Sequence, residues 1–184
     1  MTSTRIIFLD IDGVLNHQLM YKEKDQATRH QEAIDKGHPW SAGDIDPISI
    51  SYLNNLIERT GAKVVISSSW RRSGIEYCKN ALEYAGFKGE VIDITPSLNY
   101  PGAVRGNEIK AWIDSNIKHI SPSDYKEYVI LDDDSDMLLW QRENFIIVDG
   151  YCGLTPNQCY KAEFILDRNL TFSGWVDKNK QADK

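Results

Sequence analysis

The sequence contains no hydrophobic run longer than a β-strand, so we expect no segment to span a bilayer. Its first residues, MTSTRIIFLD, lack the long apolar core of a signal peptide. Cysteine is scarce: three residues without CxxC spacing do not suggest a disulfide framework, and we expect reduced thiols in a cytoplasmic protein. Lysine and arginine number 21 against 27 acidic residues, and the net charge of −6 predicts no general attraction to nucleic acid or anionic membranes. A local basic patch is still compatible with this balance.

What is present is the composition of one globular domain. Hydrophobic residues make up 41% of the chain and charged residues 26%, and 184 residues suffice for one well-buried domain but are few for two. The sequence has no internal repeat and no interior linker. We therefore expect a single domain over residues 1–175 and a disordered tail over 176–184, where nearly all residues are polar.

Short apolar runs alternate with segments of helical periodicity, which is the pattern of a parallel sheet covered by helices. The expected strands are 5–9, 62–67, 90–94, 127–134 and 144–150, and the expected helices are 24–37, 46–61, 73–85, 105–120 and 155–166. The best-defined helix has Asp46 as its cap, Pro47 in its first turn and Gly61 at its end. The sequence therefore predicts an α/β fold.

Three polar clusters follow predicted strands, at the point where each apolar run stops. They are Asp10 with Asp12, the serines 67–69, and the acidic run 132–136. Ligands of open parallel sheets bind at the carboxyl ends of the strands, so we expect the three clusters to meet there. Several carboxylates at one edge need a cation, and oxygen ligands favour Mg²⁺, while serine hydroxyls and backbone N–H groups suit phosphate oxygens. Arg105 opens the helix before the acidic run, from where its side chain could reach the same edge.

These motifs resemble those of the haloacid dehalogenase-like (HAD) superfamily of phosphohydrolases. The sequence FLDIDGVLN matches the family's first motif, VVISSSW its second, RGNEI its third and VILDDDSD its fourth, in family order. The family usually has lysine where this chain has Arg105. Within the superfamily, GAKVVISSSWR, RGNEIKAWI, YVILDDDSDM and GLT are similar to the small HAD domains associated with RNA-repair proteins.

The resemblance implies a three-layer Rossmann-like fold with a mainly parallel central sheet, and a Mg²⁺-dependent phosphatase that works through an aspartyl-phosphate. Asp10 would be the nucleophile and Asp12 the general acid and base. The phosphate would contact Ser67, Ser68, Arg71 and Arg105. Mg²⁺ would be bound by Asp10, the backbone carbonyl of Asp12, Asp132, Asp133 and Asp136.

Several residues keep a second interpretation. Lys110 competes with Arg105 for the motif-three role, and Asp134, like Asp136, could cap the next helix. Trp70 could be a stacking platform for a nucleotide, but packing between helix and sheet is the favoured interpretation. Among the residues after the serines, Arg71 is the better candidate for substrate contact.

The polar insertion 16–46 determines which substrates are expected. It has little apolar surface for a core of its own, so we expect a small flap over the sheet edge and no large cap domain. Tyr21 and Trp40 could anchor the ends of this flap on the main domain, although packing alone would equally explain both. By resemblance, an open site favours a phosphate on a large partner, such as a nucleic-acid end. Small phosphate esters, nucleotides and phosphopeptides stay open as substrates.

Two other classes of protein are compatible with parts of the pattern. A non-catalytic HAD-fold binding module is the main rival, although such proteins tend to lose the nucleophile or the acid/base, and both are present here. A phosphate-signalling receiver domain is disfavoured, because its paired acids come early in the chain and its phosphoacceptor later.

Overall fold

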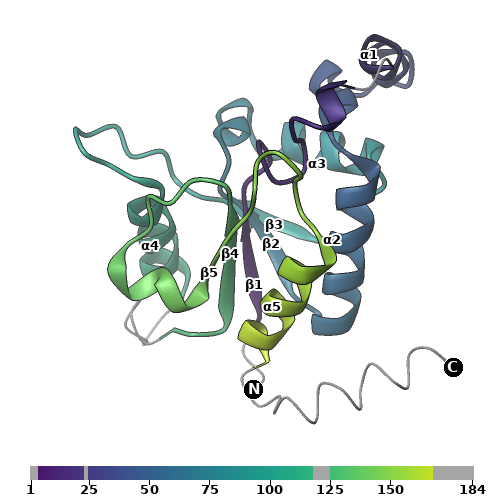
Figure 1. Ribbon diagram of the computed structural model, residues 1–184. Coiled ribbons are helices and arrows are strands. Elements are labelled where there is room, and N and C mark those ends of the chain that lie inside the picture. The colour runs from purple at the N-terminus through teal and green to yellow at the C-terminus, as the bar shows by residue number, and fades with distance from the viewer. Residues whose placement is uncertain (1–3, 23–24, 118–124, 168–184) are drawn as a thin grey trace, which may run out of the picture.

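A computed structural model describes residues 4–22, 25–117 and 125–167, and its centre is a five-stranded parallel sheet (Figure 1). The strands are β1 (Ile6–Leu9), β2 (Lys63–Ile66), β3 (Val91–Ile94), β4 (Tyr128–Asp132) and β5 (Phe145–Ile147). Their order is β3-β2-β1-β4-β5, which places the first strand in the centre. The fold class expected from the sequence, α/β and Rossmann-like, is confirmed.

Helices cover both faces of the sheet and make it the middle of three layers. The helices are α1 (Gln26–Asp35), α2 (Pro47–Thr60), α3 (Ile75–Tyr84), α4 (Arg105–Asn116) and α5 (Pro156–Leu166). Ile7 and Leu9 of β1 belong to the hydrophobic cluster that includes α2, α3 and α5, whereas Ile6 and Phe8 pack in the cluster with α4. Because both faces are covered, all four residues of β1 are buried.

The helix that was best defined by sequence begins and ends for the predicted reasons. The Asp46 carboxylate accepts hydrogen bonds from the N–H groups of Ile48 and Ser49, and Pro47 occupies the first turn of α2. Gly61 ends the helix in a left-handed conformation, with φ of 65°.

The remaining predicted elements are present with shorter bounds. The predicted strands 127–134 and 144–150 correspond to β4 and β5, and the helix expected over 73–85 corresponds to α3, preceded by a 3₁₀ helix over Ser69–Ser73. The helix expected over 105–120 ends at Asn116, and the expected tail 176–184 lies outside the described residues. None of the helices in the described part of the chain is long and apolar enough to cross a membrane.

The insertion 16–46 folds into α1 and two 3₁₀ helices, η1 (Met20–Lys22) and η2 (Trp40–Asp44), and α1 lies beyond the carboxyl ends of the strands (Figure 1). Ala33 and Ala42 are fully buried and belong to the main hydrophobic cluster, so the insertion shares the core of the domain. Tyr21 is 43% exposed and Trp40 is 55% exposed, so neither ring is buried in this core.

Candidate active site

The two aspartates of the first motif lie at the carboxyl end of the central strand, in different environments. Asp10 continues the sheet, because its N–H donates to the carbonyl of Leu131 at 3.0 Å, and it is 5% exposed. One oxygen of its carboxylate accepts a hydrogen bond of 2.8 Å from the N–H of Ile11. Asp12 lies in the turn that follows and is exposed. The chain therefore provides one buried and one solvent-accessible carboxylate at the same edge.

Gly13 allows the acidic run to approach this turn closely. Its φ is +70°, and a Cβ atom built on it would lie 2.1 Å from Oδ2 of Asp133. A side chain at this position would therefore both strain the backbone and displace the Asp133 carboxylate. The glycine of the DxDG motif is required by this contact.

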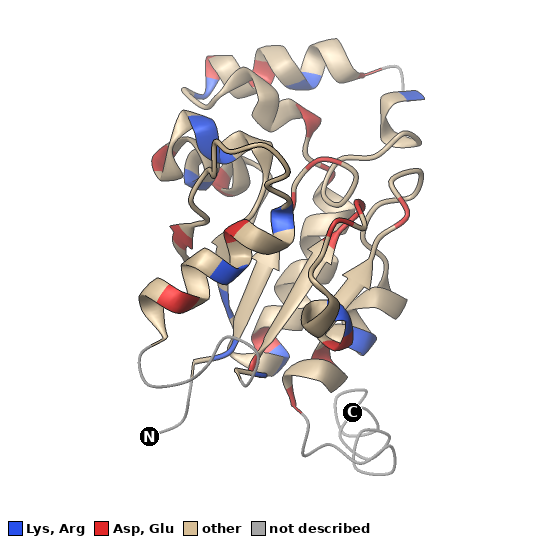
Figure 2. Ribbon diagram, turned by 90° about the vertical axis from the view of Figure 1, so that its left-hand side faces the viewer, with Lys and Arg blue, Asp and Glu red and all other residues tan. Residues whose placement is uncertain are grey.

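Three carboxylates form a compact group at the sheet edge, where acidic residues gather on the loops beyond the strands (Figure 2). Asp10, Asp132 and Asp133 each offer an oxygen, and these oxygens lie within 4.8 Å of one another. Asp132 is fully buried, and its Oδ2 has no hydrogen-bond partner among the described residues. An unsatisfied buried carboxylate oxygen beside two further acids suits a hard divalent cation.

Burial raises the pKa of both buried carboxyls of this group above the ordinary range. For Asp132 the next cause of the raised pKa is the charge of Asp10. For Asp10 burial dominates as well, while the charge of Arg105 and hydrogen bonds from Ser68 and the N–H of Ile11 lower its pKa. A bound divalent cation would favour the ionised forms, so the residues present fit Mg²⁺.

Arg105, the first residue of α4, is the cation nearest to these acids in the described chain. Its Nη2 lies 3.6 Å from Oδ2 of Asp10 and its Nε 3.5 Å from Oδ2 of Asp132. The guanidinium also donates to the carbonyl oxygen of Ser67. Lys110, the competing candidate, forms an ion pair of 2.6 Å with Asp114 on the exposed side of α4. The geometry favours Arg105 for the motif-three role.

Asp136 is placed apart from the three-carboxylate group. Its Oδ2 accepts a hydrogen bond of 2.9 Å from the N–H of Arg105, so it caps the start of α4. Asp134 is exposed, and its carboxylate accepts a hydrogen bond from the N–H of Ser135. The capping of the next helix that the sequence offered for both residues is not seen, because the 3₁₀ helix over Leu139–Asn144 has no side-chain cap, and Asp136 caps α4, which precedes it in the chain.

The serines after β2 form the loop beside Asp10. Ser67 is fully buried, and its N–H donates to the carbonyl of Leu9 at 2.8 Å. Ser68 is also fully buried; it precedes the 3₁₀ helix, called η3, over Ser69–Ser73 and accepts a hydrogen bond from the N–H of Trp70. Ser67 and Ser68 thus lie in the loop at the carboxyl end of β2, next to Asp10.

Arg71 stabilises this loop by contacts inside the protein. It is 7% exposed, and its guanidinium donates to Glu108 of α4 and, at 2.6 Å, to the carbonyl of Ser68. These bonds commit the two terminal nitrogens of the guanidinium to the backbone and to an internal ion pair, so the direct phosphate contact predicted for Arg71 is disfavoured. Glu108 was missed by the sequence reasoning, because its partner lies 37 positions away and no local pattern signals the pair.

Three donors converge on Asp12, and the sequence reasoning assigned none of them to it. The amide of Asn16 donates at 2.9 Å, the hydroxyl of Ser69 at 3.1 Å and the indole N–H of Trp70 at 3.0 Å. Trp70 also packs partly buried against the main hydrophobic cluster, as favoured from the sequence. Only Asn16 had a local signal, since it closes the DxDG turn by accepting from the N–H of Gly13.

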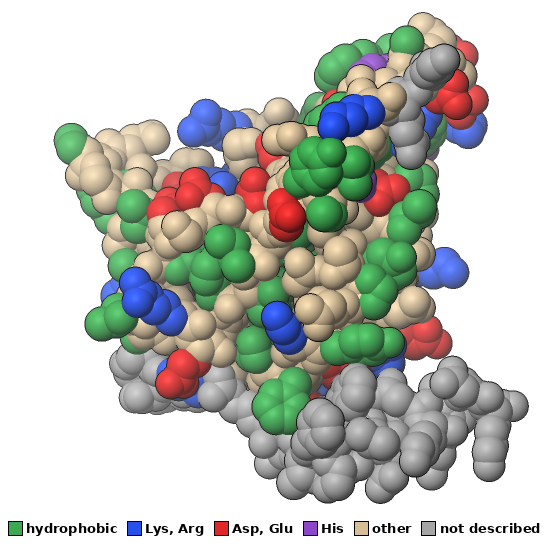
Figure 3. All heavy atoms as spheres, viewed as in Figure 1, with side chains coloured by type: hydrophobic (Ala, Val, Ile, Leu, Met, Phe, Trp, Pro, Cys, Tyr) green, Lys and Arg blue, Asp and Glu red, His purple; other side chains and the backbone are tan. Residues whose placement is uncertain are grey.

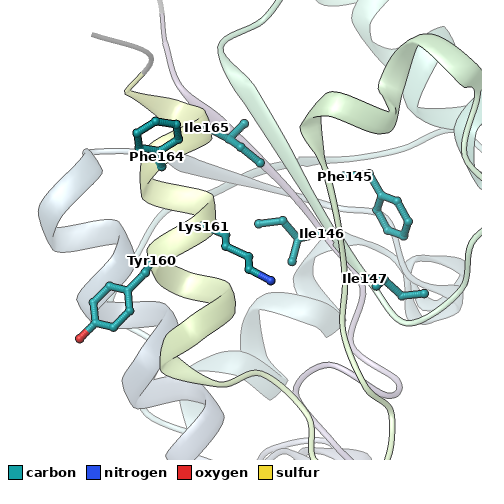
Figure 4. A pocket seen from close by; sticks show the side chains of 7 residues that line it. All are labelled: Phe145, Ile146, Ile147, Tyr160, Lys161, Phe164 and Ile165. Carbon is teal, nitrogen blue, oxygen red and sulfur yellow. The ribbon is translucent and has the colours of Figure 1, made fainter. Parts of the chain in front are cut away.

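A large apolar hollow lies away from this group. It has a volume of about 570 Å³ and lies between β5 and α5, lined by apolar side chains around Lys161 (Figure 4). The same side of the molecule shows hydrophobic side chains at its surface (Figure 3). None of its lining residues is acidic, so it offers no means of holding a metal or attacking a phosphate.

A family described as the HAD domain in Swiss Army Knife RNA repair proteins matches residues 6–159. Searches of curated proteins and of solved structures gave no match. The matched range includes all four motifs and the three-carboxylate group.

Proposed function

Because the chain belongs to the family of HAD domains in Swiss Army Knife RNA repair proteins, we propose that it is a Mg²⁺-dependent phosphohydrolase that works through an aspartyl-phosphate. The observation that carries this proposal is the juxtaposition of the buried Asp10 with Asp132, Asp133 and Arg105. A buried carboxylate at a sheet edge, faced by a cation and by a metal-binding group, is what a nucleophile for phosphate monoesters needs.

In the first step an oxygen of Asp10 attacks phosphorus, and the bond from phosphorus to the leaving oxygen breaks. Asp12 protonates that leaving oxygen, so the departing group is a neutral alcohol. In the second step Asp12 takes a proton from water, which attacks phosphorus and releases Asp10 and inorganic phosphate. Splitting the displacement in two lets one exposed carboxyl serve as acid and then as base.

The other residues of the site neutralise the charge of the phosphoryl group and position the reacting groups. Arg105 neutralises negative charge on the phosphoryl group, and the loop of Ser67 and Ser68 supplies hydroxyl and backbone donors to its oxygens. Mg²⁺, held by Asp10, Asp132 and Asp133, would supply charge neutralisation between these carboxylates and the phosphate dianion. Asn16 and Trp70 fix the orientation of Asp12.

The substrate we propose is a phosphomonoester on a nucleic-acid end. The description of the family supports a role in RNA repair, and the flap leaves the edge beside Asp12 open. A small-molecule or nucleotide phosphatase is the second candidate, favoured by the limited volume, about 310 Å³, of the pocket next to Asp12.

The test is phosphate release from purified protein with Mg²⁺. The substrates are β-glycerophosphate, oligoribonucleotides with a 3′- or 5′-phosphate, nucleotides and a phosphopeptide, with Asp10→Asn as the matched inactive control. We expect release that EDTA abolishes and Mg²⁺ restores, fastest on the oligoribonucleotides. Release that persists in Asp10→Asn or in EDTA would contradict the mechanism, and the absence of release from every substrate would favour a binding module.

A further inference from the structure

A second pocket, smaller than the apolar hollow, lies directly beside Asp12. It has a volume of about 310 Å³ and is formed where the flap meets η3 and α3, with Asp12 in its wall. Four aromatic side chains line it, namely Tyr21, Trp40, Trp70 and Tyr77. Four aromatic rings around one pocket of this size provide several flat faces for a flat ligand.

The aromatic rings are held in place by contacts that leave part of their surface open. Trp40 is 55% exposed, and its inner face packs on the ring of His30 with the centroids 4.0 Å apart. His30 is in turn hydrogen-bonded to Asp44 at 2.7 Å. The hydroxyl of Tyr77 is bonded to that of Ser41 at 2.6 Å. The flap therefore pre-organises aromatic surface that the protein's own core does not use.

The polar groups of the pocket disfavour a negatively charged ligand. Asp12 and Asp44 lie in its wall, and the described residues that line it include no lysine or arginine. Burial, followed by the charges of Asp44 and Asp12, raises the pKa of Tyr21 to about 12, so its hydroxyl remains a neutral donor. Asn16, Ser41 and Ser73 add further donors and acceptors. The pocket suits a neutral, flat group with hydrogen-bonding edges.

We propose that this pocket binds the nucleobase of the nucleotide that carries the scissile phosphate. The inference rests on the proposed phosphatase function, in which Asp12 protonates the leaving oxygen, because the leaving nucleoside then lies on the side of Asp12. Unpaired bases of RNA are commonly bound by stacking on aromatic side chains and by hydrogen bonds to their edges. The flap thus contributes aromatic side chains that bind the base of the terminal nucleotide.

The experiment compares two oligoribonucleotides with a terminal phosphate that differ only in whether the phosphorylated nucleotide has its base or is abasic. Each is tested with the phosphate at the 3′ and at the 5′ end. We expect the intact end to have a kcat/KM about 5- to 150-fold higher than the abasic end, the range of a base–aromatic stack. Trp40→Ala should remove most of this preference, and Trp40→Phe should restore it. Phe164→Ala, which removes an exposed ring of α5, is the matched control and should change neither value.

Binding provides a second readout that does not need turnover. In Asp10→Asn, the intact end should quench tryptophan fluorescence and bind more tightly than the abasic end, and Trp40→Ala should weaken that difference. Equal kcat/KM and equal binding for the two ends would overturn the proposal, as would a preference that survives Trp40→Ala. A phosphotyrosine peptide preferred over both ends, with the same dependence on Trp40, would overturn it in favour of an aromatic amino acid. Failure of the phosphatase function itself would appear separately, as no release of phosphate from β-glycerophosphate or any other substrate.

Discussion

Replacement of Trp70 by Phe should impair proton donation by Asp12 while leaving the phosphate site intact. The indole N–H lies 3.0 and 3.1 Å from the two Asp12 oxygens, so it bridges the whole carboxylate. Phe retains a six-membered aromatic ring that can pack on the main hydrophobic cluster, and it lacks the five-membered ring that carries this donor. The change therefore isolates the orientation of the general acid.

The expected loss of rate follows from the environment of the hydrogen bond between Trp70 and Asp12. A hydrogen bond to a charged group contributes about 1.5–3 kcal/mol, and the exposure of Asp12 places this one at or below the lower end. Asn16 and Ser69 still hold the carboxylate in the variant. A loss of about 1–1.5 kcal/mol corresponds to a roughly 5- to 10-fold slower step.

The assay measures release of the leaving group in a single turnover, because Asp12 also acts as base in the second step. β-Glycerophosphate, whose alkoxide needs a proton, should be released about 5- to 10-fold more slowly by Trp70→Phe. p-Nitrophenyl phosphate, whose leaving group needs none, should be little affected. Trp112→Phe, which removes a comparable indole bond to Asp93 of β3 and no donor to Asp12, should affect neither. An equal loss with both substrates would refute the reasoning, since it would mean that Trp70 acts only by packing the loop.

The remaining predictions concern the acids and the glycine of the first motif. Asp10→Asn should abolish turnover, whereas Asp12→Asn should still release p-nitrophenolate slowly, since acid catalysis contributes about 10²–10⁴-fold; near-native rates in Asp10→Asn would disprove a covalent mechanism. Gly13→Ala should weaken Mg²⁺ binding measured by calorimetry far more than Gly37→Ala, which shares a positive φ but has open space around its Cβ; equal effects would show that backbone strain alone matters. Because burial raises the pKa of Asp10 and Asp132, the metal-free native state holds extra protons above about pH 4, so these acids lower stability as pH rises toward neutrality. Urea unfolding in EDTA should therefore show a fall with pH that Mg²⁺ reverses and Asp132→Asn flattens; the same pH slope in that variant would contradict the assignment.

Much of the site could be predicted because its signals are local. Asp10, Ser67 and Asp132 each stand at the end of a buried run, and a parallel sheet brings such ends together. Arg105 was predicted to reach this edge because it begins a helix there, and its Nη2 lies 3.6 Å from Oδ2 of Asp10. The order of strands and helices could also be predicted, because short apolar runs alternate along the chain with segments of helical periodicity.

What the sequence did not reveal depends on partners far apart in the chain. The donors Ser69 and Trp70 reach Asp12 across 57 and 58 positions, and Arg71 meets Glu108 across 37. The sequence alone does not distinguish a buried arginine that is paired inside the protein from an arginine that is free to bind phosphate. The exposure of Trp40 was also missed, because large aromatic side chains are usually found inside.

The shared core of the flap has a consequence for motion at the site. Since Ala33 and Ala42 are packed within the main hydrophobic cluster, α1 cannot swing away as a hinged lid without exposing part of that cluster to water. The flap should therefore exchange its amide hydrogens with protection close to that of the sheet, and not as a separately opening unit. An entering RNA end would find the aromatic pocket already formed, and the dimensions of that pocket, more than any closing movement, would determine which ends are accepted.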